Sequence, residues 1–317
     1  MHMTTVVVTG ATSFIGLAVV RELLRQGYEV YAVVRPGSAN AAKLPAPANA
    51  AKLPAPDHGN FHIIWREMSE FPMLPGEIGR ADYFVHLAWD GVGSAGRSDP
   101  GIQEKNIRWS LEAVKAAGAM GCSRFLFSGS QAEYGIHQGA MREDCICRPV
   151  SEYGKAKLAF GARAELLCRE AGMEYIHTRI FSVYGPGDHP WSLVNSCISH
   201  FLADEAMELG ECSQRWNFLY IDDMARALTA LLQTRWLKAV GGCAYNIAGQ
   251  DTRVLKKFVE EIHRLCDSRG ACHYGKRPPN AEGPANLIPD IGKLTAVTGW
   301  HPEVSFEEGI LRTIEAR

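Results

Sequence analysis

The sequence has no hydrophobic run of the roughly 18 residues that a membrane-spanning helix requires. It also lacks a charge excess, since 33 lysines and arginines against 35 aspartates and glutamates leave a net charge of -2. This balance excludes the strongly basic surface typical of proteins that bind nucleic acids or anionic membranes. The N-terminal residues show no charged segment followed by a long apolar one, the pattern of a secretory signal. We therefore expect a soluble, cytoplasmic protein.

Cysteines in disulfide or metal-binding patterns are also missing. The nine cysteines are scattered and odd in number, which is typical of reduced thiols rather than of a disulfide framework. Cys145 and Cys147 are close in the chain, but neither a second close pair nor a histidine cluster accompanies them. The sequence therefore predicts no metal site.

The apolar content, 46% of 317 residues, is sufficient for a large core. The chain begins with the pattern of a strand, a glycine-containing turn and a helix. Residues 4–9 are rich in threonine and valine and predict a buried parallel strand, and G-A-T-S-F-I-G follows from Gly10 to Gly16. An amphipathic helix is expected at residues 17–26. Gly10 permits a tight turn, Gly16 permits close helix packing, and the helix amides then face a pyrophosphate. Ser13 stands where a third glycine is common, so the flanking strand and helix carry the prediction.

The end of the second expected strand, at residues 29–34, indicates which dinucleotide the site prefers. An acidic residue there accepts a hydrogen bond from the ribose 2′-hydroxyl of NAD. This chain instead has Arg35, and Ser38 follows shortly after. A guanidinium and a hydroxyl suit the 2′-phosphate of NADP. The sequence therefore favours NADP(H), with NAD(H) as the alternative.

Residues 39–47 read A-N-A-A-K-L-P-A-P, and residues 48–56 repeat them without a change. A short copy rich in alanine and proline adds neither a strand nor a structural repeat. We expect it to form an inserted, mobile surface loop beside the adenine end of the cofactor.

Strands and helices alternate through most of the chain. Further strands are expected at residues 61–65, 83–87, 124–128, 175–180 and 244–247, with helices at 102–117 and 153–170. This alternation predicts an α/β fold, a Rossmann-like doubly wound parallel sheet. The pattern is less regular later in the chain, where segments are expected at residues 193–202, 217–221, 222–233, 254–266 and 307–316. Those at 193–202, 254–266 and 307–316 predict a smaller C-terminal substrate-binding lobe. The dinucleotide-binding domain is expected to comprise residues 1–182 and 216–249, and the lobe residues 183–215 and 250–317.

A serine, a tyrosine and a lysine lie where one expected strand ends and the next helix begins. Ser130 follows the strand at 124–128, and Tyr153 and Lys157 are four residues apart at the start of a helix. Residues at this spacing share one helix face, so the phenol and the ammonium point into one space. A nearby ammonium stabilises a phenolate, and Tyr153 is then suited to exchange a proton with an alcohol or a carbonyl. These three residues are therefore candidates for moving a proton on an alcohol or a carbonyl.

Eight motifs occur in order along nearly the whole chain. They are T-G-A-T-S-F-I-G at 9–16, V-H-L-A at 85–88, N-I-R-W-S-L-E-A at 106–113, S-G-S-Q-A-E-Y-G at 128–135, Y-G-K-A-K at 153–157, R-I-F-S-V-Y-G-P-G-D at 179–188, F-L-Y-I-D-D-M-A at 218–225 and G-W-H-P at 299–302. The ordered series resembles the extended short-chain dehydrogenase/reductase family, which comprises nucleotide-sugar epimerases, dehydratases and ketoreductases.

The resemblance implies a role for each of the three residues. Tyr153 would be the acid/base, Lys157 its partner and the residue that holds the nicotinamide ribose, and Ser130 the donor to the substrate oxygen. The substrate would be a nucleotide-linked sugar, and the protein a homodimer that pairs the helices at 102–117 and 153–170. The implied cofactor contacts are Gly10, Thr12, Ser13, Phe14, Ile15, Gly16, Arg35, Ser38, Leu87, Ala88, Tyr153 and Lys157.

Departures from the family pattern narrow the reaction. Sugar 4,6-dehydratases of the family place acids one or two positions after the catalytic Ser or Thr, where this chain has Gln131 and Ala132. Glu133 comes one position later and should face the other way on an extended backbone. Arg35 favours NADPH-dependent reduction of a 4-keto sugar, which is the expected activity. An NAD-dependent C4 epimerase is the alternative, and a non-catalytic NADP-sensing regulator is the alternative from another class.

Candidate substrate contacts come from loops that follow the expected strands. Ser182 replaces an asparagine common in the family, and His189 is a candidate auxiliary acid/base. Arg215 is displaced by one position from the arginine that usually binds the diphosphate, and Trp216 is placed to stack on a base. Tyr220 and Asp223 are expected to be structural. The substrate candidates are Trp89, Asp90, Gln131, Ser182, His189 and Arg215.

Overall fold

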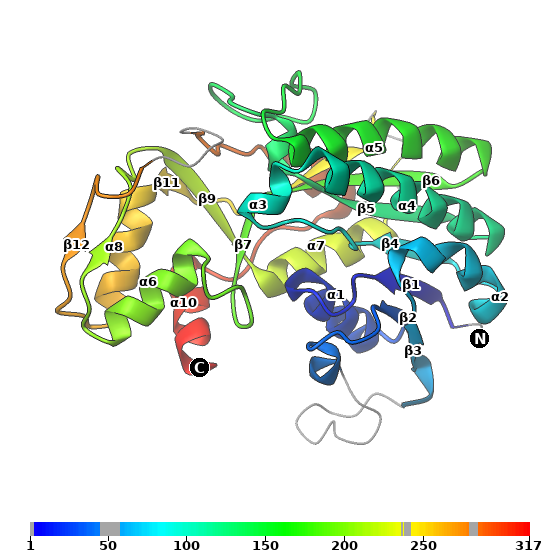
Figure 1. The fold of residues 1–317 in the computed structure, drawn as a ribbon, viewed down its shortest axis with the longest axis horizontal. Helices are drawn as coiled ribbons and strands as arrows, with labels where there is room; N and C mark the ends of the chain where they lie inside the picture. Colours follow the sequence, from blue (N-terminus) through cyan, green and yellow to red (C-terminus); the bar gives the residue numbers. More distant parts are fainter. Residues whose placement is uncertain (1–2, 45–57, 236, 238–241, 279–284) are drawn as a thin grey trace.

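The computed structural model describes residues 3–44, 58–235, 237, 242–278 and 285–317. Its largest element is a seven-stranded parallel sheet in the order β10-β6-β5-β4-β1-β2-β3 (Figure 1). From β1 to β3 each new strand is added toward one edge of the sheet, and from β4 onwards toward the other edge, so the strand order switches between β1 and β4. In folds of this kind, ligands bind at the carboxyl ends of the strands on either side of such a switch. The predicted Rossmann-like doubly wound sheet is confirmed. The strands are β1 (Thr5–Thr9), β2 (Glu29–Val34), β3 (Phe61–Trp65), β4 (Tyr83–His86), β5 (Arg124–Ser130), β6 (Glu174–Ile180) and β10 (Ala244–Ile247).

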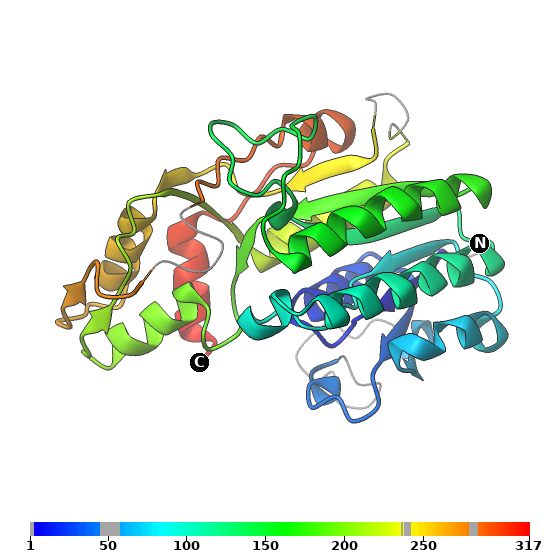
Figure 2. The same ribbon diagram turned by 45° about the horizontal axis from the view of Figure 1, so that its top comes forward.

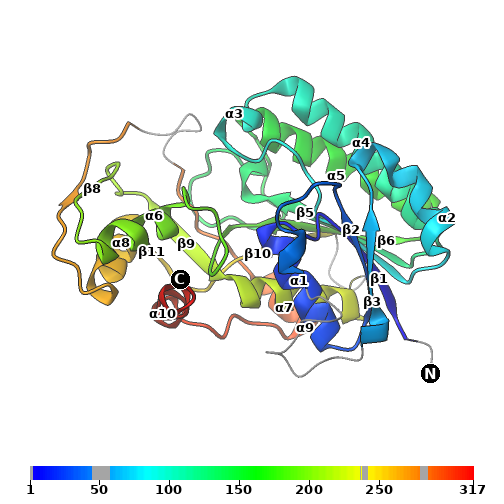
Figure 3. The same ribbon diagram turned by 60° about the horizontal axis from the view of Figure 1, so that its bottom comes forward.

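Helices cover both faces of the sheet, because alternate strand residues point to opposite sides. In β1, Val6 and Val8 pack into one core layer and Val7 into the other. Figure 2 shows α4 and α5 side by side on one face, and Figure 3 shows α1, α7 and α9 together on the other. The first face carries α2 (Leu74–Ile78), α4 (Pro100–Ala119) and α5 (Glu152–Glu170), and the second α1 (Phe14–Arg25), α7 (Ile221–Gln233) and α9 (Gly292–Thr298).

A smaller group of elements lies at one end of the large sheet (Figure 1). It contains a three-stranded sheet in the order β11-β9-β7 and the pair β12-β8. Asp223 on α7 connects the two parts: its buried carboxylate accepts the backbone N–H groups of Glu303 (3.0 Å) and Val304 (2.9 Å). The elements are β7 (Ser182–Tyr184), α6 (Leu193–Leu202), β8 (Met207–Glu208), β9 (Arg215–Tyr220), β11 (Thr252–Val254), α8 (Leu255–Leu265), β12 (Cys272–His273) and α10 (Phe306–Glu315).

The expected long elements are present, with shifts of one to three residues at several ends. The first helix begins at Phe14 rather than at residue 17 because Ser13 caps it: the Ser13 hydroxyl accepts the Gly16 N–H at 3.0 Å. Short strands such as β7 and β11 were not predicted, since two or three residues carry no periodicity. Residues 45–57, which hold most of the repeat, lie outside the described residues. None of the helices in the described ranges is long and apolar enough to span a membrane.

Candidate active site

The turn between β1 and α1 forms a cradle that side chains would fill. Gly10 has a positive φ of 67°, and a Cβ there would lie 2.7 Å from the Ala88 amide nitrogen. A Cβ on Gly16 would lie 2.8 Å from the carbonyl carbon of Ala11, so only glycine allows α1 to approach the turn this closely. This close packing brings the N-terminus of α1 to the carboxyl end of β1, where a helix N-terminus would hold a dinucleotide pyrophosphate.

Polar side chains at the rim of this cradle already contact one another. The Arg35 guanidinium lies 3.4 Å from the Asp90 carboxylate, and both side chains are largely exposed. The Ser38 hydroxyl donates to the Thr12 hydroxyl at 3.0 Å. Ser38 therefore contacts Thr12 of the turn, and Arg35 lies beside Asp90 on the loop after β4.

Ser130, Tyr153 and Lys157 meet at the carboxyl end of β5. Ser130 is the last residue of the strand, and all three side chains are buried. A Cβ on Gly154 would lie 2.5 Å from the Ala132 carbonyl oxygen, so this glycine lets the first turn of α5 approach the strand end. The Ser151 hydroxyl caps α5 by accepting the Gly154 N–H at 3.2 Å.

Lys157 is held in an aromatic and almost dry environment. Its ammonium donates to the Ser128 carbonyl at 2.7 Å and lies 4.0 Å from the Trp89 ring and 4.6 Å from the Phe127 ring. Burial lowers the pKa of Lys157 well below its ordinary value; the negative charge of Glu133 opposes this effect, and the positive charge of Arg97 adds to it. The proton on Lys157 is therefore sensitive to these two neighbouring charges.

The loop after β4 places a second cation beside the catalytic tyrosine. The Arg97 guanidinium lies 4.2 Å from the centre of the Tyr153 ring. The loop is fixed from α4: Asn106 bonds both the N–H and the carbonyl of Asp90, and Gln103 donates to the Gly96 carbonyl at 2.9 Å. These bonds hold the backbone around Arg97, so that its guanidinium lies against the Tyr153 ring.

A cavity of about 660 Å³ lies between the strand end and the smaller group of elements. Gln131 and Ala132, which follow Ser130, line one side, and Trp216 lines the other. Arg277 and Glu211 are the charged residues among the described ones around it. A cavity of this volume is sufficient for a ligand of the size of a nucleotide sugar.

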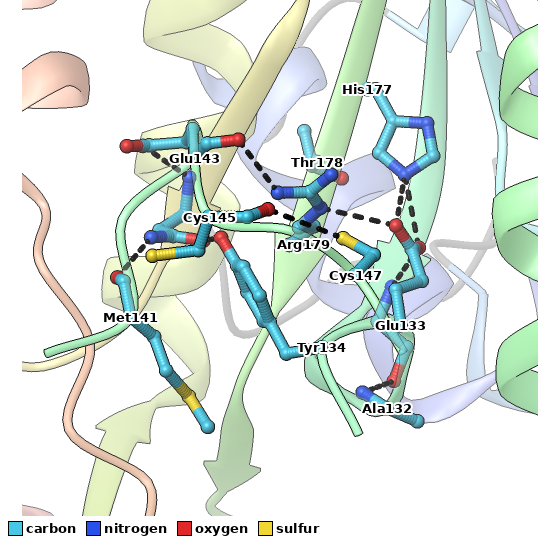
Figure 4. A network of polar contacts seen from close by, with 12 residues as sticks. Ala132, Glu133, Tyr134, Met141, Glu143, Cys145, Cys147, His177, Thr178 and Arg179 are labelled. Atoms are coloured by element: carbon cyan, nitrogen blue, oxygen red, sulfur yellow. Dashed lines mark hydrogen bonds and ion pairs between the residues drawn. The ribbon is translucent and has the colours of Figure 1, made fainter. Parts of the chain in front are cut away.

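The carboxylate of Glu133 does not face this cavity. The backbone turns into a short 3₁₀ segment at residues 131–133 instead of staying extended, so the predicted reason for its orientation was wrong. Glu133 is fully buried behind Ser130, where it contacts His177 and Arg179 (Figure 4). The position after Ser130 thus presents an amide and a methyl group to the cavity, and no carboxylate.

Residues 6–248 match the sequence pattern of the NAD dependent epimerase/dehydratase family. The chain belongs to this family. The members of the epimerase/dehydratase family that it resembles include an uncharacterized UDP-glucose epimerase of Bacillus subtilis, 26% identical over 66% of this chain and 65% of that protein. The UDP-glucuronate 4-epimerase of Thermodesulfobacterium geofontis is 24% identical over 97% of this chain and 94% of its own.

A solved structure of the family has the same fold. The UDP-glucuronic acid 4-epimerase of Bacillus cereus, in complex with UDP-glucuronic acid and NAD, superposes with a TM-score of 0.83. It is 24% identical, with 99% of this chain and 98% of that chain covered. Our chain is thus an enzyme of the epimerase/dehydratase class, and the predicted non-catalytic regulator is not supported.

Within this epimerase/dehydratase enzyme, the predicted substrate residues are spread over several places. Gln131 lines the cavity. Trp89 is buried, with its indole N–H donating to Gln103 at 2.8 Å, so it packs beneath Lys157 rather than facing the cavity. Arg215 donates to the Thr252 carbonyl at 2.8 Å and is not among the residues that line the cavity. The fold therefore uses these two side chains for packing and strand pairing.

The remaining candidates lie on the segment after β6. Ser182 is half-buried on β7, where it pairs with Phe218, and His189 is exposed and stacks on Trp191 with ring centres 4.4 Å apart. Sequence reasoning missed Arg97 and Arg277, because Arg97 ends a four-residue helix, α3 (Ser94–Arg97), and Arg277 lies in an irregular segment, and neither is long enough to show a periodic pattern. A cation after a glycine-rich stretch was the only signal available for Arg97.

Proposed function

We propose that the protein is an NAD-dependent C4 epimerase of a nucleotide sugar. One observation carries this proposal: Gln131 and Ala132, the two residues after the buried Ser130, line the cavity at the positions where elimination of water would need carboxylates. Such a site supports oxidation and reduction at one carbon, without dehydration of the neighbouring ones. The relatives named as UDP-glucuronate 4-epimerases support epimerisation over the single 4-keto reduction predicted from Arg35.

In this proposal the chain's residues move one proton in each direction. Tyr153 accepts the proton of the sugar 4-hydroxyl as the C4 hydride leaves, and later returns it to the oxygen of the epimer. Ser130 donates a hydrogen bond to that oxygen and fixes its position. Lys157 stabilises the phenolate of Tyr153 and holds the ribose next to the nicotinamide. Bound NAD supplies the hydride acceptor, which the cradle between Gly10 and Gly16 would hold.

Epimerisation then requires the 4-keto intermediate to present its other face before the hydride returns. The cavity is sufficient for this rotation if the nucleotide remains anchored. Trp216 offers a ring face for the base, and Arg277 a guanidinium for the diphosphate. We propose both as the nucleotide-binding residues, in place of the Arg215 predicted from the sequence.

NAD is the cofactor that fits an epimerase, because the coenzyme leaves the cycle in the form in which it entered. Asp90 beside Arg35 supports NAD, since it offsets the cation that would attract a 2′-phosphate. The NADP preference predicted from Arg35 and Ser38 stays a prediction, as does the homodimer through α4 and α5. The test for the latter is the molecular mass in solution.

The proposal is tested with NAD-loaded protein and UDP-glucose or UDP-glucuronic acid carrying deuterium at C4. A C4 epimerase converts each accepted sugar to an equilibrium mixture with its epimer, and the deuterium stays at C4 because the same hydride returns. Tyr153→Phe should abolish turnover, whereas the matched control Tyr31→Phe, on a distant strand, should not. NADPH consumption by a 4-keto sugar without interconversion of the epimers would refute epimerisation and restore the reductase.

A further inference from the structure

Glu133 is a fully buried carboxylate that no step of the proposed reaction uses. Both of its oxygens contact the His177 Nε2 atom, at 2.9 and 2.8 Å, and the Arg179 Nε atom donates at 3.1 Å. It also accepts the backbone N–H of Ser130 at 2.8 Å. Figure 4 shows Glu133, His177 and Arg179 pointing toward one another behind the strand end. Burying a carboxylate is costly unless it is paired in this way, so the arrangement is specific.

Two glycines make the room for this cluster. A Cβ on Gly129 would lie 2.5 Å from both the Glu133 Oε1 and the His177 Nε2 atoms. On the other side, a Cβ on Gly161 would lie 2.5 Å from the His177 Cε1 atom. Gly161 is four residues after Lys157, on the same face of α5. The Glu133–His177 pair is therefore packed between β5 and the helix that carries the catalytic tyrosine and lysine.

The pair and Lys157 hold the same three residues of β5. The Lys157 ammonium binds the carbonyl of Ser128, and the Glu133 carboxylate binds the N–H of Ser130. We propose that Glu133, oriented by His177, is a positioning residue: it fixes the Ser130 amide and places a negative charge behind the strand segment that Lys157 binds. This assignment rests on the proposed roles of Ser130 and Lys157.

The charges around Lys157 favour this role for Glu133. Three other groups lie near the Lys157 ammonium. They are Arg97 from the segment after β4, the buried and neutral His86 at the end of β4, and Tyr153 on α5. Glu133 is the carboxylate whose charge raises the pKa of Lys157 against the larger effect of burial. Burial by itself raises the pKa of Glu133, but the charges and hydrogen bonds of His177 and Arg179 outweigh it and lower that pKa.

Hydrogen-bond donation orients the carboxylate. The His177 Nε2 atom faces both Glu133 oxygens, and its Nδ1 atom lies 2.9 Å from the Tyr175 hydroxyl, so the ring is held from both sides. Arg179 is held in turn by the Glu143 carbonyl at 3.1 Å. Cys147 lies near Arg179 and Glu133, and its pKa is raised by burial, so it stays a neutral thiol near pH 7. Glu133 therefore stays ionised through the neutral range.

The test compares Glu133→Gln with the control Glu143→Gln. Glu143 is a half-buried carboxylate ten residues further along the chain, and it accepts the N–H of Asn246 rather than that of Ser130. In Glu133→Gln the alkaline limb of kcat should move to lower pH by about one unit, or about tenfold in kcat on that limb. KM for the sugar should change little. Glu143→Gln should keep the wild-type profile.

A second pair of variants separates positioning from folding. His177→Gln keeps a donor at the place of Nε2 and should restore a near wild-type profile, whereas His177→Phe should reproduce the shift. Loss of thermal stability in Glu133→Gln with an unchanged pH profile would overturn the proposal and leave Glu133 a structural residue only.

NAD titrations by calorimetry keep this test independent of turnover. Because Lys157 is placed to hold the ribose, its deprotonation should weaken NAD binding about three- to tenfold at alkaline pH. This loss should begin at lower pH in Glu133→Gln than in the wild type. If the wild type converts no sugar, the proposed function fails, and these titrations still decide the role of Glu133: identical pH dependence in both proteins overturns it.

Discussion

Replacing Gly16 by alanine should weaken cofactor binding while leaving the fold intact. The new methyl carbon would lie 2.8 Å from the Ala11 carbonyl carbon and closer still to the Gly10 carbonyl oxygen. The first turn of α1 must then move away from the β1–α1 turn. Overpacking of this kind costs about 1–3 kcal/mol, which a folded domain of this size tolerates.

The effect on the cofactor is larger because the pyrophosphate depends on the helix amides. Misaligned hydrogen bonds to a charged group should cost about 2 kcal/mol, which corresponds to about 30-fold weaker binding. At a concentration of about 100 times the wild-type Kd, NAD stabilises the wild type by about 2.7 kcal/mol. The same concentration stabilises Gly16→Ala by about 0.9 kcal/mol. The NAD-induced rise in Tm should therefore fall to about a third.

The assay is thermal unfolding with and without NAD, repeated over a titration. Gly76→Ala is the matched control, because a Cβ at this position on α2 would contact nothing within 4 Å. It should keep the full NAD-induced rise in Tm. Its free energy of unfolding should increase by about 0.5 kcal/mol, because alanine reduces the conformational freedom of the unfolded chain. A Gly16→Ala protein with the wild-type rise in Tm would refute the role of Gly16 in the cradle.

Four further substitutions test other parts of the site. Arg35→Asp should shift the affinity ratio toward NAD in competition binding; an unchanged ratio would mean that Arg35 does not contact the 2′-phosphate. Arg277→Gln should raise KM for the nucleotide sugar about tenfold, by loss of a contact worth about 1.5 kcal/mol, with kcat nearly constant. Asp223→Ala leaves the partly buried N–H groups of Glu303 and Val304 without their acceptor and should lower the free energy of unfolding by about 2 kcal/mol in urea; a loss below about 1 kcal/mol contradicts this. Because the folded-state pKa of Glu133 is lowered, its ionised form stabilises the fold above the unfolded-state pKa of 4.5, and this contribution disappears as pH falls. Glu133→Gln should therefore destabilise more at about pH 7 than at about pH 3, and equal losses at both would contradict the argument.

The cofactor and the substrate contacts were predicted from single residues, whereas the fold was predicted from a repeated pattern. Arg35 suggested NADPH and a reductase, but the side chain lies beside Asp90, which the linear sequence does not place next to it. Arg215 was expected at the diphosphate by its motif position, yet strand alternation turns Trp216 to the cavity instead. In both cases the sequence offered a single residue, and only the structure shows the neighbour that it contacts.

By itself, the sequence determined the parallel sheet and the glycine turn, and it predicted the serine, tyrosine and lysine that we propose as catalytic, because each depends on a local pattern. A valine-rich run, a glycine turn and two residues one helical turn apart need no distant partner to be recognised. Tertiary structure alone decided what surrounds them. Glu133 and His177 are 44 residues apart and meet only because β5 and β6 pair in the register that sets Phe127 against His177. Arg97 likewise reaches the Tyr153 ring only after α4 has fixed its loop. The charges that control the proton on Lys157 thus come from strand register and loop packing, which no short stretch of sequence encodes.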